Sequence, residues 1–198
     1  FNRPMEQTEN FLKKKFANKP NLVEANIKLL HAGYHFAETI EALPSAYTVL
    51  PASLEKGTYR NIMGNQATAW GFLAAAEHSK RKLYLGTYPI TPASDVLHEL
   101  TKHKYFGVTT FQAEDEIAAI CSAIGASFAG SLAITTTSGP GLALKGEALG
   151  LAMMAELPIV VVDIQRGGPS TGLPTKTEQS DLMQAVYGRN GECPTIVV

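Results

Sequence analysis

The sequence predicts an α/β fold: a parallel sheet with helices on both faces, preceded by a short, mostly helical tail. Two observations support it. From residue 64 onward, short apolar runs alternate with segments of helical periodicity over about 135 residues, as in a parallel sheet with crossover helices. The runs are continuously apolar rather than alternating, which is typical of strands buried on both faces.

The tail and linker are predicted to cover residues 1–60. Residues 1–38 are largely polar, with apolar side chains at helical spacing, so we expect helices there. The second helix is predicted to begin with Asn21 as its N-cap, because Glu24 three residues later has the spacing of a capping box. Residues 39–63 show little periodicity and contain proline and glycine, so we expect an extended connector.

The α/β domain is predicted to cover residues 61–198. Its strands are short runs rich in apolar and β-branched residues, at residues 83–88, 108–112, 132–136 and 158–163, with a last strand from residue 195. The intervening segments have helical periodicity and cover residues 66–77, 92–100, 114–129, 142–155 and 176–187. Because the last strand ends with the chain, we expect the domain to be truncated at its C-terminal end.

Composition argues against several functional classes. The 17 Lys and Arg residues balance 18 Asp and Glu residues, for a net charge of −1, so the broad positive surface of a nucleic-acid-binding protein is not expected. No apolar run approaches the length of about 18 residues needed to span a bilayer. Cys121 and Cys193 are too few for a four-thiolate zinc site or an iron–sulfur cluster. We expect a cytoplasmic protein with no metal site of its own.

Polar residues and glycines follow the ends of the first four predicted strands. In an open parallel sheet, ligands bind outside the carboxyl ends of the strands. The segments that follow these ends cover residues 88–94, 111–114, 137–141 and 164–172. Their convergence on one edge of the sheet predicts a binding site there.

Two of these segments lead directly into predicted helices. Thr91 precedes Pro92, which suits the first position of a helix, so Thr91 is a predicted N-cap. Its hydroxyl either only caps the helix or also binds a substrate. Glu114 is predicted to open the next helix, whose dipole favours its charged form. Asp115 and Glu116 are better explained as an ordinary charged first turn, whereas Glu114 at the strand exit suits proton exchange with a heterocyclic nitrogen.

The other two segments contain a glycine-rich turn and a cation. Residues 138–141, Ser-Gly-Pro-Gly, precede an apolar helix as a phosphate-binding turn does. They lack the lysine of a P-loop and the spacing of a dinucleotide fingerprint, and glycine equally allows close approach of backbone to a flat ligand. Arg166 is the cation of the last loop and either pairs with a carboxylate or is solvated. Lys145 is predicted to lie on a helix surface or at an interface.

These motifs, taken in order, resemble those of one known family. They occupy residues 64–67, 88–92, 111–114, 137–141, 165–175 and 179–185. Together they look like the alpha subunit of the 2-oxoacid:ferredoxin oxidoreductases, most closely the 2-oxoglutarate type, over residues 61–198. Residues 1–50 are more weakly similar to the end of the gamma-type domain, which in some members is fused ahead of the alpha domain.

The resemblance implies an enzyme subunit that is active only with a partner. Members of the family oxidatively decarboxylate a 2-oxoacid, form its acyl-CoA and pass electrons to ferredoxin, and thiamine diphosphate supplies the carbanion chemistry. This chain would form the pyrimidine-binding domain. The diphosphate, its Mg²⁺ and a [4Fe-4S] cluster would belong to a beta subunit, so a hetero-oligomer or dimer is expected.

The same resemblance implies roles for individual residues. Glu114 would be the catalytic carboxylate facing the aminopyrimidine ring, where it promotes the imino tautomer that deprotonates the thiazolium carbon. Thr91 and Arg166 would bind the substrate, with Arg166 pairing the 2-oxoacid carboxylate. The residues implied to contact the cofactor, besides Glu114, are Tyr88, Pro89, Ile90, Ser138 and Gly139.

Two other functions stay open from the residues alone. One is a nucleotide- or phosphate-binding α/β module that uses the turn at residues 138–141. The other is a structural or regulatory subunit that keeps the fold without the chemistry; the joint presence of Glu114, Thr91 and Arg166 argues against it. Within the family, the sequence leaves open whether the substrate is 2-oxoglutarate, pyruvate or a branched-chain 2-oxoacid.

Overall fold

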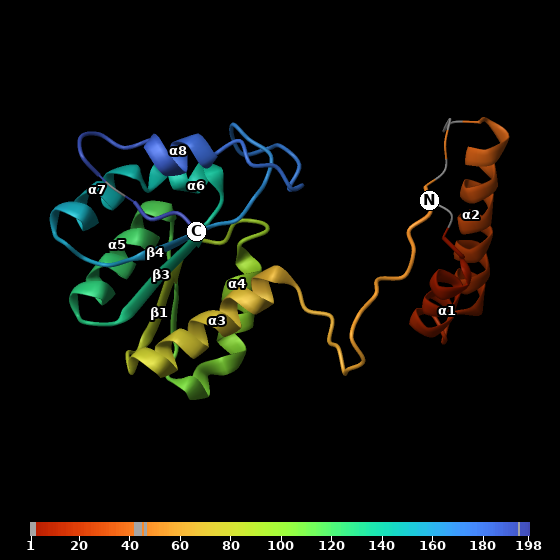
Figure 1. Cartoon of the computed structure of the whole chain (residues 1–198), viewed down its shortest axis with the longest axis horizontal. Helices are drawn as coiled ribbons and strands as arrows, with labels where there is room; N and C mark the ends of the chain where they lie inside the picture. Colours follow the sequence, from red (N-terminus) through yellow and green to blue (C-terminus); the bar gives the residue numbers. More distant parts are fainter. Residues whose placement is uncertain (1–2, 42–44, 46, 194) are drawn as a thin grey trace. The chain divides into compact units, whose positions relative to one another are not determined.

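A computed structural model describes residues 3–41, 45, 47–193 and 195–198. The chain divides into two compact units, Phe1–Tyr59 and Arg60–Val198 (Figure 1). The predicted connector has neither helix nor strand from residue 47 to residue 63, and its residues 42–44 and 46 lie outside the described part. Each unit is taken by itself below.

The first unit is a pair of helices, α1 (Glu6–Lys15) and α2 (Pro20–Thr39). They pack against each other, and the His31 ring lies 2.8 Å from a Glu9 carboxylate oxygen across the pair. The prediction that Asn21 caps α2 is wrong, because the helix begins at Pro20 with Lys19 in the N-cap position. Proline suits the first helical position, where no backbone N–H is needed and its fixed φ already matches the helix.

The second unit centres on a four-stranded parallel sheet (Figure 1). Its strands are β1 (Leu83–Thr87), β2 (Thr109–Gln112), β3 (Leu132–Thr137) and β4 (Val160–Asp163), in the order β2-β1-β3-β4. The register aligns the carboxyl ends, since Thr87 pairs with Gln112 and Thr137 pairs with Asp163. The predicted α/β fold with a parallel sheet is therefore confirmed.

Helices cover both faces of this sheet, as Figure 1 shows for α3 and α4 on one side and α5 and α7 on the other. The elements are α3 (Gly64–Ser79), α4 (Ser94–Leu100), the 3₁₀ helix η1 (Thr101–Phe106), α5 (Glu116–Phe128), α6 (Gly139–Leu144), α7 (Gly146–Met154) and α8 (Leu182–Tyr187). One apolar cluster joins α3 and α4 to β1 and β3, and a second joins α5 to α7. The expected burial on both faces holds for the central strands β1 and β3. It is wrong for the edge strands, because β2 is mostly exposed and β4 is half-buried or exposed.

Three predicted elements differ in the structure. Residues 195–198 form no strand, since they pair with none of the four strands and Ile196 is 94% exposed; residue 194 lies outside the described part. The helix predicted over residues 142–155 is divided at Lys145 into α6 and α7. The last helix begins only at Leu182. Among the described helices, none is long and apolar enough to cross a membrane.

Candidate functional site

The strand order places a binding crevice at the carboxyl ends of β1 and β3. These strands are neighbours, but the chain leaves β1 toward β2 and leaves β3 toward β4, in the opposite direction. Such a switch point is where open α/β sheets bind ligands. Buried hydrogen bonds join the two strand ends. Thr87 Oγ1 lies 2.7 Å from Thr136 Oγ1 and donates to the Thr136 carbonyl oxygen over 2.9 Å.

The segment after β1 brings Tyr88 to Thr91 to this edge. Tyr88 and Thr91 are exposed, and Pro89 and Ile90 are half-buried. The prediction that Thr91 caps α4 is wrong, because the helix begins at Ser94 with Ala93 in the N-cap position. A turn at residues 91–93 intervenes, and the Ser94 N–H donates to the Ile90 carbonyl oxygen over 3.0 Å. The Thr91 hydroxyl bonds to none of the described residues and is free for a ligand.

Arg166, in the loop after β4, reaches across to this segment. Its Nη1 donates to the Thr91 carbonyl oxygen over 3.0 Å, and its Nη2 donates to the Leu173 carbonyl oxygen over 3.3 Å. The side chain is only 7% exposed, so the alternative of a solvated loop arginine is wrong. Its buried Nε has no partner among the described residues and remains as a donor. The structure thus brings together the two residues expected to bind the substrate.

Glu114 lies at the carboxyl end of β2, outside the helix that it was expected to open. The helix α5 begins at Glu116, because Asp115 is the N-cap and its Oδ1 accepts from the Ala118 N–H over 2.7 Å. On the other side of Glu114, the Ala113 N–H donates to the Thr87 carbonyl oxygen over 2.9 Å. The exposed Glu114 carboxylate takes no hydrogen bond or ion pair from the described residues, so it is available to a ligand.

The turn at Ser138 and Gly139 is packed by the chain's own side chains. Ser138 is fully buried in the N-cap position of α6, and its Oγ has no partner among the described residues. A Cβ atom placed on Gly139 would lie 2.8 Å from Asp181 Oδ2. The glycine therefore allows Asp181 to approach the backbone. This packing favours a close-contact turn over a phosphate cradle.

Sequence reasoning missed a carboxyl pair at the end of β4. Both carboxylate oxygens of Asp163 are buried without an N–H or hydroxyl donor from the described residues, and they face Asp181. Burial raises the pKa of Asp163, and the hydrogen bond and negative charge of Asp181 raise it further. The folded chain therefore favours the protonated form of Asp163. One feature of the sequence could have indicated Asp163 as a site residue: it ends a predicted strand, and polar residues at strand ends gather at one edge of the sheet.

Lys145 was also misplaced by sequence reasoning. It is fully buried between α6 and α7, and its Nζ donates to the Glu116 carbonyl oxygen over 2.9 Å. Burial lowers the pKa of Lys145 to about 8, although the carboxylates of Glu116 and Asp115 favour its charged form. No sequence signal marks this lysine, because helical periodicity does not show what covers a given face.

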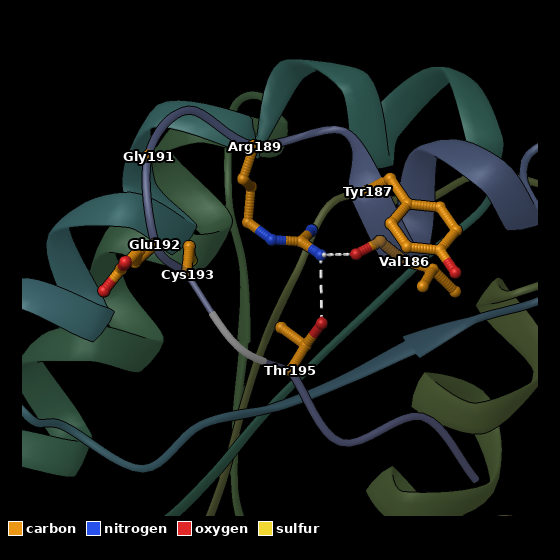
Figure 2. Close-up of a pocket in the computed structure, with 7 residues that line it drawn as sticks. All are labelled: Val186, Tyr187, Arg189, Gly191, Glu192, Cys193 and Thr195. Carbon is orange, nitrogen blue, oxygen red and sulfur yellow. Dashed lines mark hydrogen bonds between the residues drawn. The ribbon is translucent and has the colours of Figure 1, made fainter.

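A cavity of about 590 Å³ lies elsewhere, beside the end of α8. Figure 2 shows its lining and the Arg189 side chain, whose Nη2 donates to the Val186 carbonyl oxygen over 2.9 Å and to Thr195 Oγ1 over 3.0 Å. None of the residues expected to bind substrate or cofactor lines it. The candidate site is therefore the strand edge, and this cavity is separate from it.

Comparison with known proteins identifies the family of the chain. The family described as "Pyruvate flavodoxin/ferredoxin oxidoreductase, thiamine diP-bdg" matches residues 81–198. The chain is 57% identical to the 2-oxoglutarate oxidoreductase subunit KorA of Mycobacterium tuberculosis, covering 100% of this chain and 30% of that protein. It is 44% identical to the 2-oxoglutarate synthase subunit KorA of Archaeoglobus fulgidus, covering 69% of this chain and 38% of that protein.

A solved structure is similar as well. It is described as the 2-oxoglutarate:ferredoxin oxidoreductase from Magnetococcus marinus with 2-oxoglutarate, coenzyme A and succinyl-CoA bound, and it matches with a TM-score of 0.63 at 40% identity. The match covers 98% of this chain and 33% of that one, so the chain spans about a third of the length of such relatives. By family match and by identity, the chain belongs to the pyruvate flavodoxin/ferredoxin oxidoreductase family, in its thiamine diphosphate-binding part.

Proposed function

We propose that the chain is part of the alpha subunit of a 2-oxoglutarate:ferredoxin oxidoreductase. The whole enzyme would convert a 2-oxoacid and coenzyme A to the acyl-CoA and CO₂, and pass two electrons to ferredoxin. The observation that carries this proposal is the group at the strand edge: the exposed carboxylate of Glu114, the free hydroxyl of Thr91 and the buried guanidinium of Arg166. The KorA relatives support 2-oxoglutarate as the substrate.

The strand edge fits the pyrimidine end of thiamine diphosphate. An exposed carboxylate without a partner among the described residues suits a ring nitrogen that must exchange a proton, and Glu114 is such a group. Tyr88, Pro89 and Ile90 follow the end of β1, which pairs with β2, and the closely packed turn at Ser138 and Gly139 follows the end of β3. When bound, the cofactor supplies the electron sink for the carbanion left by decarboxylation.

The chain's own residues then have distinct tasks. Glu114 holds or donates a proton at the pyrimidine nitrogen. Arg166, oriented by its bonds to two carbonyl oxygens, directs a positive charge at the 2-oxoacid carboxylate. Thr91, whose carbonyl oxygen accepts from Arg166, offers its hydroxyl to the same substrate.

The remaining parts of the enzyme belong to partners in this proposal. A beta subunit would hold the diphosphate, Mg²⁺ and a [4Fe-4S] cluster, and ferredoxin would accept the electrons. Residues 1–60 would be the end of a gamma-type domain with its linker, and residues 61–198 the pyrimidine-binding domain. A cytoplasmic location is in keeping with the free thiols of Cys121 and Cys193.

The test uses the full-length chain co-produced with its beta subunit. Turnover of 2-oxoglutarate is measured with coenzyme A, thiamine diphosphate, Mg²⁺ and an artificial electron acceptor. We expect activity that falls at least 100-fold in Glu114→Gln and is unchanged in Glu147→Gln, which alters an exposed carboxylate of α7 outside the site.

Other outcomes each correct a different part of the proposal. Turnover of pyruvate or a branched-chain 2-oxoacid in place of 2-oxoglutarate would keep the reaction and change the substrate. Near-normal turnover of Glu114→Gln would remove Glu114 from the chemistry. A complex that binds thiamine diphosphate but turns over no 2-oxoacid would indicate a structural or regulatory subunit.

A further inference from the structure

Lys145 is the largest fully buried side chain in the described part of the chain. Lysine is almost never fully buried unless its amine is paired. Here the amine has one hydrogen-bond partner among the described residues, the carbonyl oxygen of Glu116 at 2.9 Å. A methionine or leucine would fill the same space without desolvating an ammonium group, so packing alone does not account for a lysine at this position.

The partner of Lys145 is the first residue of α5. Asp115 caps this helix, and Glu114 immediately precedes the cap. The side chain of Glu116 also packs against α6, since a Cβ atom placed on Gly141 would lie 2.9 Å from Glu116 Cγ. The start of α5 is thus held against the junction of α6 and α7 by one hydrogen bond and one close contact.

The other side of Glu114 is held by the sheet. The Ala113 N–H donates to the carbonyl oxygen of Thr87, the last residue of β1. Glu114 therefore lies between Ala113, which is hydrogen-bonded to β1, and the start of α5, which is hydrogen-bonded to Lys145. Its own carboxylate has no tether among the described residues, so its position depends on these two anchors.

We propose that Lys145 is a positioning residue for Glu114. By holding the Glu116 carbonyl, the amine fixes the first turn of α5 and with it the place from which Glu114 faces the pyrimidine ring. This inference rests on the proposed function of Glu114. It adds Lys145, buried at the junction of α6 and α7 and 31 positions away in the sequence, to the group that serves the cofactor.

The first test measures local order in the complex without cofactor. Hydrogen exchange of the full-length chain with its beta subunit is followed by mass spectrometry for wild type, Lys145→Met and the exposed control Lys104→Met. Exchange at Ala118 and Ala119, whose N–H groups donate to Asp115 at the start of α5, should be at least 10-fold faster in Lys145→Met, because the start of α5 loses a hydrogen bond that holds it. It should be unchanged in Lys104→Met. Unchanged exchange in Lys145→Met would overturn the proposal.

The second test is a double-mutant cycle on turnover. Lys145→Met should lower kcat about 10-fold or more through misplacement of Glu114, while the KM for the 2-oxoacid changes less than 2-fold. In the Glu114→Gln background the same substitution should change kcat less than 2-fold, because the group that it positions is already lost. Lys145→Gln, whose amide is still a donor, should recover part of the rate.

The outcomes separate this inference from the proposed function. Losses in kcat that multiply in the double variant would give Lys145 a merely structural role and overturn the inference, with the function of Glu114 intact. Wild-type turnover in Glu114→Gln would overturn both. If Lys145→Met does not fold, the same cycle is run with Lys145→Gln, and the same two results decide.

Discussion

Arg166 Nη1 donates to the carbonyl oxygen of Thr91 over 3.0 Å, although the two residues lie 75 positions apart in the sequence. The bond joins the loop after β4 to the segment after β1, across the whole of β3. It uses the backbone of Thr91, so the hydroxyl stays free, and it orients a guanidinium that is nearly buried. The two residues expected to bind substrate therefore form one structural unit whose parts can be tested separately.

Loss of the guanidinium should weaken substrate binding. In the reconstituted enzyme, Arg166→Ala should raise the KM for the 2-oxoacid about 10- to 100-fold, because a charge-assisted hydrogen bond is worth about 1.5–3 kcal/mol. Arg166→Lys should recover only part of this, since lysine lacks the planar fork that holds two carbonyl oxygens. Steady-state kinetics with varied 2-oxoacid measure both effects. An unchanged KM in Arg166→Ala would refute the carboxylate-binding role.

Removal of the Thr91 hydroxyl should have a smaller effect than loss of Arg166. Thr91→Val keeps the carbonyl that Arg166 binds and removes only the hydroxyl. A neutral hydrogen bond is worth about 1 kcal/mol, so the KM for the 2-oxoacid should rise about 5-fold. Thr91→Ser, which keeps the hydroxyl, is the matched control and should stay within 2-fold of wild type. Equal kinetics for the valine and serine variants would exclude a substrate contact through this hydroxyl.

The strands were the most predictable part of the fold. The four strands of the sheet lie within two residues of their expected bounds. The central strands β1 and β3 are largely buried, whereas the edge strand β2, Thr-Thr-Phe-Gln, is mostly exposed and is marked by its β-branched residues instead. The run at residues 195–198 has the same composition but no neighbouring strand to pair with, so it forms no ladder. Composition thus records a tendency to form strands, whereas pairing decides whether a strand forms.

Helix starts and buried polar groups were less predictable. Glu114 and Asp115 both suit a helix start, and only the hydrogen bond from Ala118 to Asp115 decides between them. The buried positions of Lys145 and Asp163 follow from elements packed on them from other parts of the chain. Local sequence carries no record of such burial.

The Asp163–Asp181 pair should make stability fall as pH rises. Asp163 has an ordinary pKa of 3.8 when unfolded and about 8 when folded, so between these values the folded chain holds a proton that the unfolded chain has released. The resulting stabilisation is complete below about pH 4 and is lost as pH rises through about 8. Thermal unfolding from about pH 6 to pH 9 should therefore show a steeper fall in Tm for wild type than for Asp163→Asn.

The control for this prediction alters an exposed carboxyl group. Asp95→Asn changes the first turn of α4 and should leave the pH dependence of wild type intact. The asparagine in Asp163→Asn is neutral at every pH and places no second negative charge beside Asp181, so its Tm should exceed that of wild type at the alkaline end. Identical pH profiles for wild type and Asp163→Asn would show that the pKa of Asp163 is not raised in the folded chain.

A methyl group at Gly139 should disturb the turn that we propose faces the cofactor. A Cβ atom there would lie 2.8 Å from Asp181 Oδ2 and 3.0 Å from Asp181 Cβ, so Gly139→Ala forces the start of α6 away from Asp181. Overpacking of this kind typically costs about 1–3 kcal/mol of unfolding free energy, and the displaced turn should also weaken thiamine diphosphate binding. Denaturant unfolding and cofactor titration of the full-length complex measure the two effects.

Gly125→Ala is the matched control for Gly139→Ala. Gly125 lies within α5, and a methyl group added there would meet nothing within 4 Å, so alanine removes only backbone freedom and should stabilise the chain by about 0.5–1 kcal/mol. Both variants replace glycine with alanine. If Gly139→Ala lowers the free energy of unfolding and Gly125→Ala raises it, the loss at Gly139 comes from the contact with Asp181. A Gly139→Ala variant as stable as wild type, with unchanged cofactor affinity, would mean that the turn accommodates a methyl group without loss of stability. It would also mean that the close packing of this turn is not needed for cofactor binding.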